Sequence, residues 1–98
     1  MKIDLTEEQI KIVHTILMKN ISGVEVWAFG SRVKFTAKKF SDLDLVIVSN
    51  SVIPFEVMFS IKADFEESNL PFKVDVLDWS LISDEFKKII SEQFIRFC

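Results

Sequence analysis

Residues 24–48 read VEVWAFGSRVKFTAKKFSDLDLVIV and predict two β-strands with polar residues at their ends. Val24 to Phe29 is rich in β-branched and aromatic residues, which favour strands. Gly30-Ser31 follows at once, and a glycine there indicates a sharp turn or a backbone that approaches a ligand closely. Leu43 to Ser49 predicts the second strand. This placing of a Gly-Ser turn and an aspartate pair at strand ends suggests nucleotide chemistry.

The start of the second strand carries two aspartates with one residue between them. Side chains alternate between the faces of a strand, so Asp42 and Asp44 project from the same face, close enough to share a cation. Leu43, Leu45 and Ile47 then face the core. The strand therefore predicts one charged face and one packed face.

The rest of the chain alternates between helical and extended patterns. Thr6 and Gln9 form a capping box before an apolar stripe with helical spacing. The predicted helices are Thr6–Lys19, Pro54–Glu67 and Asp84–Phe97, and the predicted third strand is Phe72–Leu77. The helices are expected to bury stripes made of Ile10, Val13, Ile16 and Leu17, of Phe55, Val57, Met58, Ile61 and Phe65, and of Phe86, Ile89, Ile90 and Phe94. Residues 32–39 fit either a short helix or a solvated loop.

Length and element order bound the fold class. With 98 residues, 49% of them hydrophobic, we expect a single domain over residues 1–98 with one compact core. The order of elements is typical of a small α/β (α+β) fold in which helices flank a three-stranded sheet. The pattern leaves the strand directions open.

Composition argues against several classes of protein. The net charge of −3 and the pI near 5.1 are unlike those of a general nucleic-acid binder, so we expect no direct nucleic-acid binding. Cys98 has no second cysteine to pair with, and the N-terminal residues have no uninterrupted apolar run. We therefore expect a cytoplasmic protein.

A third acid lies inside the third predicted strand. Lys73, Asp75 and Leu77 share one face of that strand, so Asp75 joins the aspartate pair if this strand lies beside the second. Three carboxylates suit a two-magnesium site for phosphoryl or nucleotidyl transfer. Backbone N–H groups at Gly30-Ser31 can cradle a triphosphate, and Arg32 or a nearby lysine can neutralise the pyrophosphate that leaves.

Each of these features has a plainer interpretation. Gly-Ser is common in loops, and D-x-D also occurs as a turn cap, as a surface calcium site and in sugar-transferring enzymes. Asp75 fits an edge-strand charge that discourages aggregation. The exposed-loop interpretation also applies to Lys34, Lys38 and Lys39, and His14, the only histidine, fits packing or surface. The order and spacing of the motifs favour the nucleotide site.

The motifs together resemble a known family. FGSR at 29–32, SDLDLVIV at 41–48 and VDVLDW at 74–79 are similar to the minimal nucleotidyltransferases of the DNA polymerase beta superfamily. That family has the pattern G-S-x-x-x-G, then S-D-x-D-L, then a later acid. The resemblance covers nearly the whole chain and implies a nucleotidyltransferase fold with a small mixed sheet.

The resemblance implies a role for each site residue. The implied nucleotide-binding set is Gly30, Ser31, Arg32 and Ser41, and the implied catalytic and metal-binding set is Asp42, Asp44 and Asp75. Two Mg²⁺ ions are the implied cofactor, and ATP is the implied substrate. Asp75 is also expected to help accept the proton of the attacking hydroxyl.

The small members of this family are antitoxins that inactivate a HEPN-type toxin by attaching AMP from ATP to a tyrosine, which implies the same activity and partner here. Phe35 departs from the family pattern, because it stands at the second glycine. Phenylalanine enters positive φ at a cost, so we expect the loop to take another path or the site to be weakened. The alternative is a binding module of the same fold that neutralises the toxin by contact.

Apolar residues after the strands are candidates for contact with the partner. The set is Val52, Ile53, Trp79 and Leu81, with Trp79 the first choice, and core packing is the equal alternative. A small-molecule nucleotidyltransferase is a third possibility, but the sequence shows no second domain to bind such a substrate.

Overall fold

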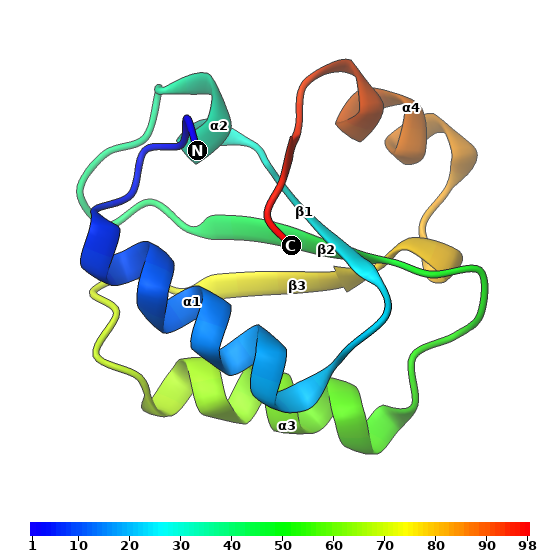
Figure 1. Cartoon of the computed structure of the whole chain (residues 1–98). Coiled ribbons are helices and arrows are strands. Elements are labelled where there is room, and N and C mark those ends of the chain that lie inside the picture. Colours follow the sequence, from blue (N-terminus) through cyan, green and yellow to red (C-terminus); the bar gives the residue numbers. More distant parts are fainter.

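Four strands form one mixed sheet in the computed structural model, which describes residues 1–98 (Figure 1). The elements are α1 (Glu7–Asn20), β1 (Glu25–Phe29), α2 (Ser31–Lys34), β2 (Leu43–Val48), α3 (Phe55–Glu67), β3 (Val74–Asp78), the 3-10 helix η1 (Trp79–Leu81), α4 (Asp84–Glu92) and β4 (Ile95–Arg96). The strand order is β3-β2-β1-β4. β1 is antiparallel to β2 and β4, whereas β2 and β3 are parallel.

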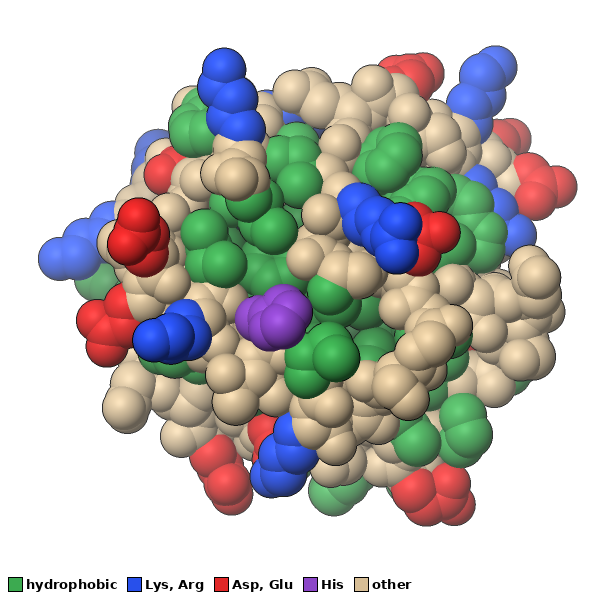
Figure 2. Space-filling model, viewed as in Figure 1, with side chains coloured by type: hydrophobic (Ala, Val, Ile, Leu, Met, Phe, Trp, Pro, Cys, Tyr) green, Lys and Arg blue, Asp and Glu red, His purple; other side chains and the backbone are tan.

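Helices cover both faces of the sheet. Figure 1 shows α1 and α3 side by side on one face, while α2 and α4 lie on the other. The Asn20 amide joins α1 to α3, because it donates to the Asp64 carboxylate at 2.9 Å and accepts from the Ser60 hydroxyl at 2.7 Å. Charged side chains of both signs are scattered over the molecular face in Figure 2, with apolar groups between them.

The local signals of α1 act as the sequence predicts. The Thr6 hydroxyl accepts from the Gln9 N–H at 3.1 Å, and the Gln9 side chain accepts from the Thr6 N–H at 3.0 Å. Val13 and Leu17 are fully buried, and Ile10 is partly buried against the core. On β2, alternation places Leu43, Leu45 and Ile47 in the core. No helix is long and apolar enough to cross a membrane.

The prediction of three strands is wrong, because the C-terminal residues form a fourth. The last helix ends at Glu92 rather than Phe97, and Ile95 and Arg96 pair with β1. The two-residue strand is too short to show a period of its own, so its pairing depends on the neighbouring strand. Phe94 lies outside the helix and stacks on Trp27, with ring centroids 3.9 Å apart.

Two predicted helix stripes are only partly buried. In α3, Ile61 and Phe65 are buried, but Phe55 at the first turn is 76% exposed. In α4, Ile90 is buried, whereas Ile89 is 58% exposed. Periodicity identified the helices, but the extent of each buried face depends on how far the neighbouring elements reach.

Candidate active site

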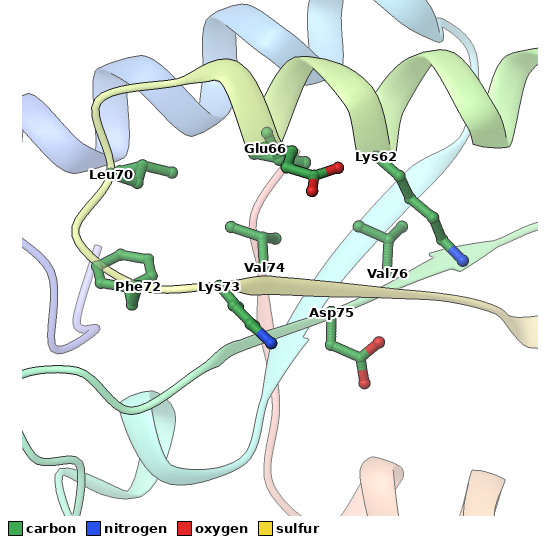
Figure 3. Close-up of a pocket in the computed structure, with 9 residues that line it drawn as sticks. Lys62, Glu66, Leu70, Phe72, Lys73, Val74, Asp75 and Val76 are labelled. Carbon is green, nitrogen blue, oxygen red and sulfur yellow. The ribbon is translucent and has the colours of Figure 1, made fainter.

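Three aspartates lie on one face of the sheet at neighbouring strand ends. Asp44 on β2 is directly opposite Asp75 on β3 in the parallel register, and Asp42 directly precedes β2. Figure 3 shows Val74 and Val76 pointing toward α3 while Asp75 points to the other side of β3. The structure therefore brings together the acids that the sequence pattern selected, and it does so because β2 and β3 are neighbours.

The Asp44 carboxylate is half-buried and stands between the other two acids. Burial, and after it the negative charges of Asp75 and Asp42, together raise the pKa of Asp44 from 3.8 to about 6. At neutral pH this carboxylate is charged, although its surroundings favour the protonated form. A cation at this face would relieve that repulsion.

The donors on this face fit magnesium in their chemistry. Carboxylate oxygens are hard ligands, and magnesium keeps several waters and substrate phosphates in its shell, so it needs few protein ligands. As the side chains stand, no three His, Cys, Asp or Glu groups lie close enough together to hold a metal ion. Repulsion between like charges opposes such convergence, so ion binding would require these carboxylates to turn toward one another.

Gly30 provides the space beside Asp44. It precedes α2 with φ 79° and ψ −155°, a combination that is essentially confined to glycine. A Cβ placed on Gly30 would overlap the Asp44 carboxylate and would lie 3.3 Å from its Cγ. The Gly30 carbonyl also accepts from the N–H groups of Val33 and Lys34, at 3.1 and 3.0 Å. Ser31 is thus held at the start of α2, next to the acids.

Arg32 is enclosed by the loop that leads to Asp42. Its side chain is buried at 5% exposure, and its guanidinium donates to backbone carbonyls, including that of Ser41 at 2.8 Å. The Ser41 hydroxyl in turn accepts from the Lys38 N–H at 2.8 Å. Both side chains therefore hold the loop before Asp42. The nucleotide-binding role implied for Arg32 and Ser41 stays a prediction.

The short-helix interpretation of residues 32–39 is confirmed for the first turn, and the loop interpretation for the rest. Phe35 ends α2 with φ 57° and ψ 36°, so it adopts the left-handed conformation that a glycine would take there. The loop thus keeps that conformation rather than taking another path, and the strain falls on an exposed phenylalanine.

Phe35→Gly is expected to raise the free energy of unfolding by up to about 1 kcal/mol. The left-handed conformation costs a residue with a Cβ about 1–2 kcal/mol, and the extra freedom of glycine in the unfolded chain offsets part of that gain. Urea unfolding of both proteins measures the difference. A less stable variant would show instead that packing of the Phe35 ring outweighs the strain.

Asp78 is a buried acid that the sequence patterns did not single out. Its carboxylate accepts from the Ile53 N–H at 2.8 Å, the Ser80 N–H at 2.9 Å and the Ser80 hydroxyl at 2.6 Å. These bonds join the end of β3 to the segment before α3. The Asp78-x-Ser80 spacing is a local signal for a capping aspartate, but the bond to Ile53 depends on the fold.

Comparisons with known proteins identify the family of this chain. The family model described as polymerase beta, nucleotidyltransferase matches residues 5–96. The probable protein adenylyltransferase MntA of Haemophilus influenzae is 45% identical over 94 residues, which cover 96% of this chain and 82% of that protein.

Solved structures of toxin–antitoxin complexes share the fold. A chain in a toxin–antitoxin crystal structure with AMP-PNP aligns with a TM-score of 0.75 and 19% identity, over 91% of this chain and 72% of that one. A chain in a complex of a tri-AMPylated HEPN toxin with an MNT antitoxin, from Shewanella oneidensis, aligns with a TM-score of 0.67 and 17% identity, over 91% of this chain and 68% of that one.

Proposed function

This chain is a nucleotidyltransferase of the polymerase beta family, and we propose that it transfers AMP from ATP to a tyrosine hydroxyl of a HEPN-type toxin, acting as the antitoxin. The proposal rests on one observation: Asp42, Asp44 and Asp75 lie on the same face of the sheet. Gly30 lies beside them, and its lack of a side chain leaves room for the Asp44 carboxylate. The relatives support the partner, since the similar MntA protein is a probable protein adenylyltransferase and the solved complexes pair toxins with antitoxins.

Asp42, Asp44 and Asp75 would together hold two magnesium ions. Bound magnesium supplies positive charge that neutralises the phosphate oxygens. The turn at Gly30 and Ser31 would hold the triphosphate through its backbone N–H groups.

The reaction joins the tyrosine oxygen to the α-phosphorus and breaks the bond from that phosphorus to the oxygen of the leaving pyrophosphate. The hydroxyl proton passes to the Asp75 carboxylate, which is exposed on the same face as Asp44. The partner supplies the tyrosine, because this chain contains none.

The deciding experiment uses the purified chain, the candidate toxin and ATP labelled on the α-phosphate. Label and one AMP mass per modified tyrosine are expected on the toxin with magnesium, and neither with EDTA. In parallel, ATP at a hundred times its dissociation constant should stabilise the chain by about 2.7 kcal/mol only when magnesium is present. A stable complex without added AMP mass would favour the alternative, a binding module that neutralises the toxin by contact.

The surface that meets the partner is proposed to include Leu81 and Val52, which are 68% and 59% exposed. Trp79, the first choice from sequence, instead packs edge-on against Trp27 with centroids 5.2 Å apart, and Lys87 lies over its ring. Its half-buried ring therefore belongs to an aromatic cluster of the fold.

Leu81→Ser is expected to slow modification of the toxin about tenfold, because an exposed apolar side chain at the centre of an interface contributes about 1–2 kcal/mol. Stabilisation by Mg-ATP should stay unchanged. The control is Met18→Ser on α1, where the side chain is 52% exposed on the face of the sheet away from the acids. Equal rates for both variants would move the interface elsewhere.

A further inference from the structure

We propose that Arg32 is a positioning residue, which holds the backbone on either side of the acid cluster in place and does not bind the triphosphate. The inference rests on the proposed function of this site. It begins from the hydrogen bonds of the guanidinium, which donates to the carbonyls of Asp4, Lys38, Lys39 and Ser41.

The strongest of these contacts acts on Asp42 through one peptide bond. Arg32 Nη2 and Nε donate to the Ser41 carbonyl at 2.8 and 3.2 Å. That carbonyl belongs to the same rigid peptide plane as the Asp42 nitrogen, so fixing its oxygen fixes the direction in which Asp42 leaves the loop. The next residue, Leu43, donates its N–H to the Lys73 carbonyl at 2.9 Å and so starts the pairing with β3.

A second contact reaches the strand that carries Asp75. The Arg32 Cζ lies 4.1 Å from the centroid of the Phe72 ring, and Phe72 is 8% exposed. Phe72 precedes β3 by two residues, so the guanidinium lies between the chain that leads to Asp42 and the chain that leads to Asp75. The planar guanidinium can stack on the ring and donate in its own plane at once, which a lysine ammonium cannot do.

The N-terminal segment also forms hydrogen bonds with Arg32. Arg32 Nη1 donates to the Asp4 carbonyl at 3.0 Å, and the Asp4 N–H donates back to the Arg32 carbonyl at 2.8 Å. Ile3 beside it is buried in the core. Arg32 therefore bonds to the N-terminal segment by both its side chain and its backbone.

The burial of Arg32 favours a positioning role over direct binding of phosphate. The Arg32 side chain forms no ion pair, and at 5% exposure its charge is balanced by carbonyl oxygens and the face of the Phe72 ring. Burying a cation is costly unless its donors are satisfied, so turning it out toward a triphosphate would break these bonds and free the loop. The function of Arg32 is therefore to hold Asp42 in position.

The test is Arg32→Lys, with Arg96→Lys as the matched control, because the Arg96 side chain is 65% exposed and pairs with Glu25 on the surface. In the metal-free protein, amides of residues 38–43 should exchange hydrogen at least tenfold faster in Arg32→Lys, while those of α1 stay protected. Calorimetric titration with Mg²⁺ and AMP-PNP should show the magnesium requirement raised about 10–100-fold. Transfer should recover most of its rate at saturating magnesium, with the KM for ATP within about twofold of the parent protein.

Two other results would overturn the proposal. A raised KM for ATP at saturating magnesium, with unchanged exchange in the loop, would make Arg32 a triphosphate ligand. A lower melting temperature with unchanged magnesium affinity and transfer would make it a residue of the fold alone. If Arg32→Lys does not fold, Phe72→Leu removes the stacking ring but keeps an apolar side chain, and should shift the same readouts less. Exchange and calorimetry do not need the toxin, so they stand even if the parent protein transfers no AMP.

Discussion

Asp44→Asn is expected to lower nucleotidyl transfer by about 10³-fold while leaving the fold intact. The amide keeps the shape of the carboxylate but not its charge, and charge stabilisation by bound metal is worth several kcal/mol at such sites. About 4 kcal/mol corresponds to a thousandfold in rate. Single-turnover transfer of labelled AMP measures the loss. Asp64→Asn is the control, since that carboxylate lies on α3 and bonds to Asn20 and Lys19.

The same variant should be more stable than the parent protein at neutral pH without metal. The folded-state pKa of Asp44 is raised to about 6, so the stability associated with its protonated form is present below pH 4 and is lost as the pH rises through 6. Asparagine mimics the protonated form and does not titrate. Because the side chain is half-exposed, solvent screening reduces the expected gain at pH 7 to about 1 kcal/mol.

Thermal unfolding in EDTA at pH 4 and pH 7 isolates this effect. The melting temperatures of Asp44→Asn and the parent should be nearly equal at pH 4, and the variant should melt about 4–8 °C higher at pH 7. Magnesium with ATP should raise the melting temperature of the parent only. A difference that does not change with pH would contradict the raised pKa of Asp44, and normal transfer by the variant would remove Asp44 from the site.

Gly30→Ala is expected to cost about 2–4 kcal/mol of stability and to abolish transfer. The backbone angles of Gly30 cost a residue with a Cβ about 1–3 kcal/mol, and the new methyl group would also overlap the Asp44 carboxylate. Either the turn or the carboxylate must move, and both belong to the proposed site. Chemical denaturation gives the stability, and nucleotide binding by the folded fraction gives the effect on the site.

Gly23→Ala is the matched control for this substitution. Gly23 also has positive φ, at 74°, but a Cβ there meets nothing within 4 Å. It should lose about 1–2 kcal/mol from backbone strain alone and keep full transfer. If Gly30→Ala were no worse than Gly23→Ala in both readouts, the close approach of Gly30 to Asp44 would have no functional consequence.

Local patterns in the sequence were sufficient for most elements and for the choice of the three acids. The capping box at Thr6 and the alternation around Asp42 and Asp44 are properties of a few consecutive residues, so they can be read without knowing what packs against them. Alternation in the third predicted strand also singled out Asp75, and the family motifs then implied roles for Asp75 and for the turn at Gly30. The patterns did not reveal β4, since two residues have no period, nor the exposure of Phe55 at the edge of a predicted stripe.

The sequence by itself determined which side chains share a face of each strand, because alternation is a property of the backbone. Only the tertiary structure decided that Asp44 is half-buried and that β3 lies parallel to β2, which sets Asp75 opposite Asp44. The burial and the charge of Asp75 both raise the pKa of Asp44. The tertiary structure also decided that Arg32 is buried, since its carbonyl partners come from segments on both sides of it in the chain. A charge is exposed or enclosed according to which distant segments meet around it, and no local pattern contains that information.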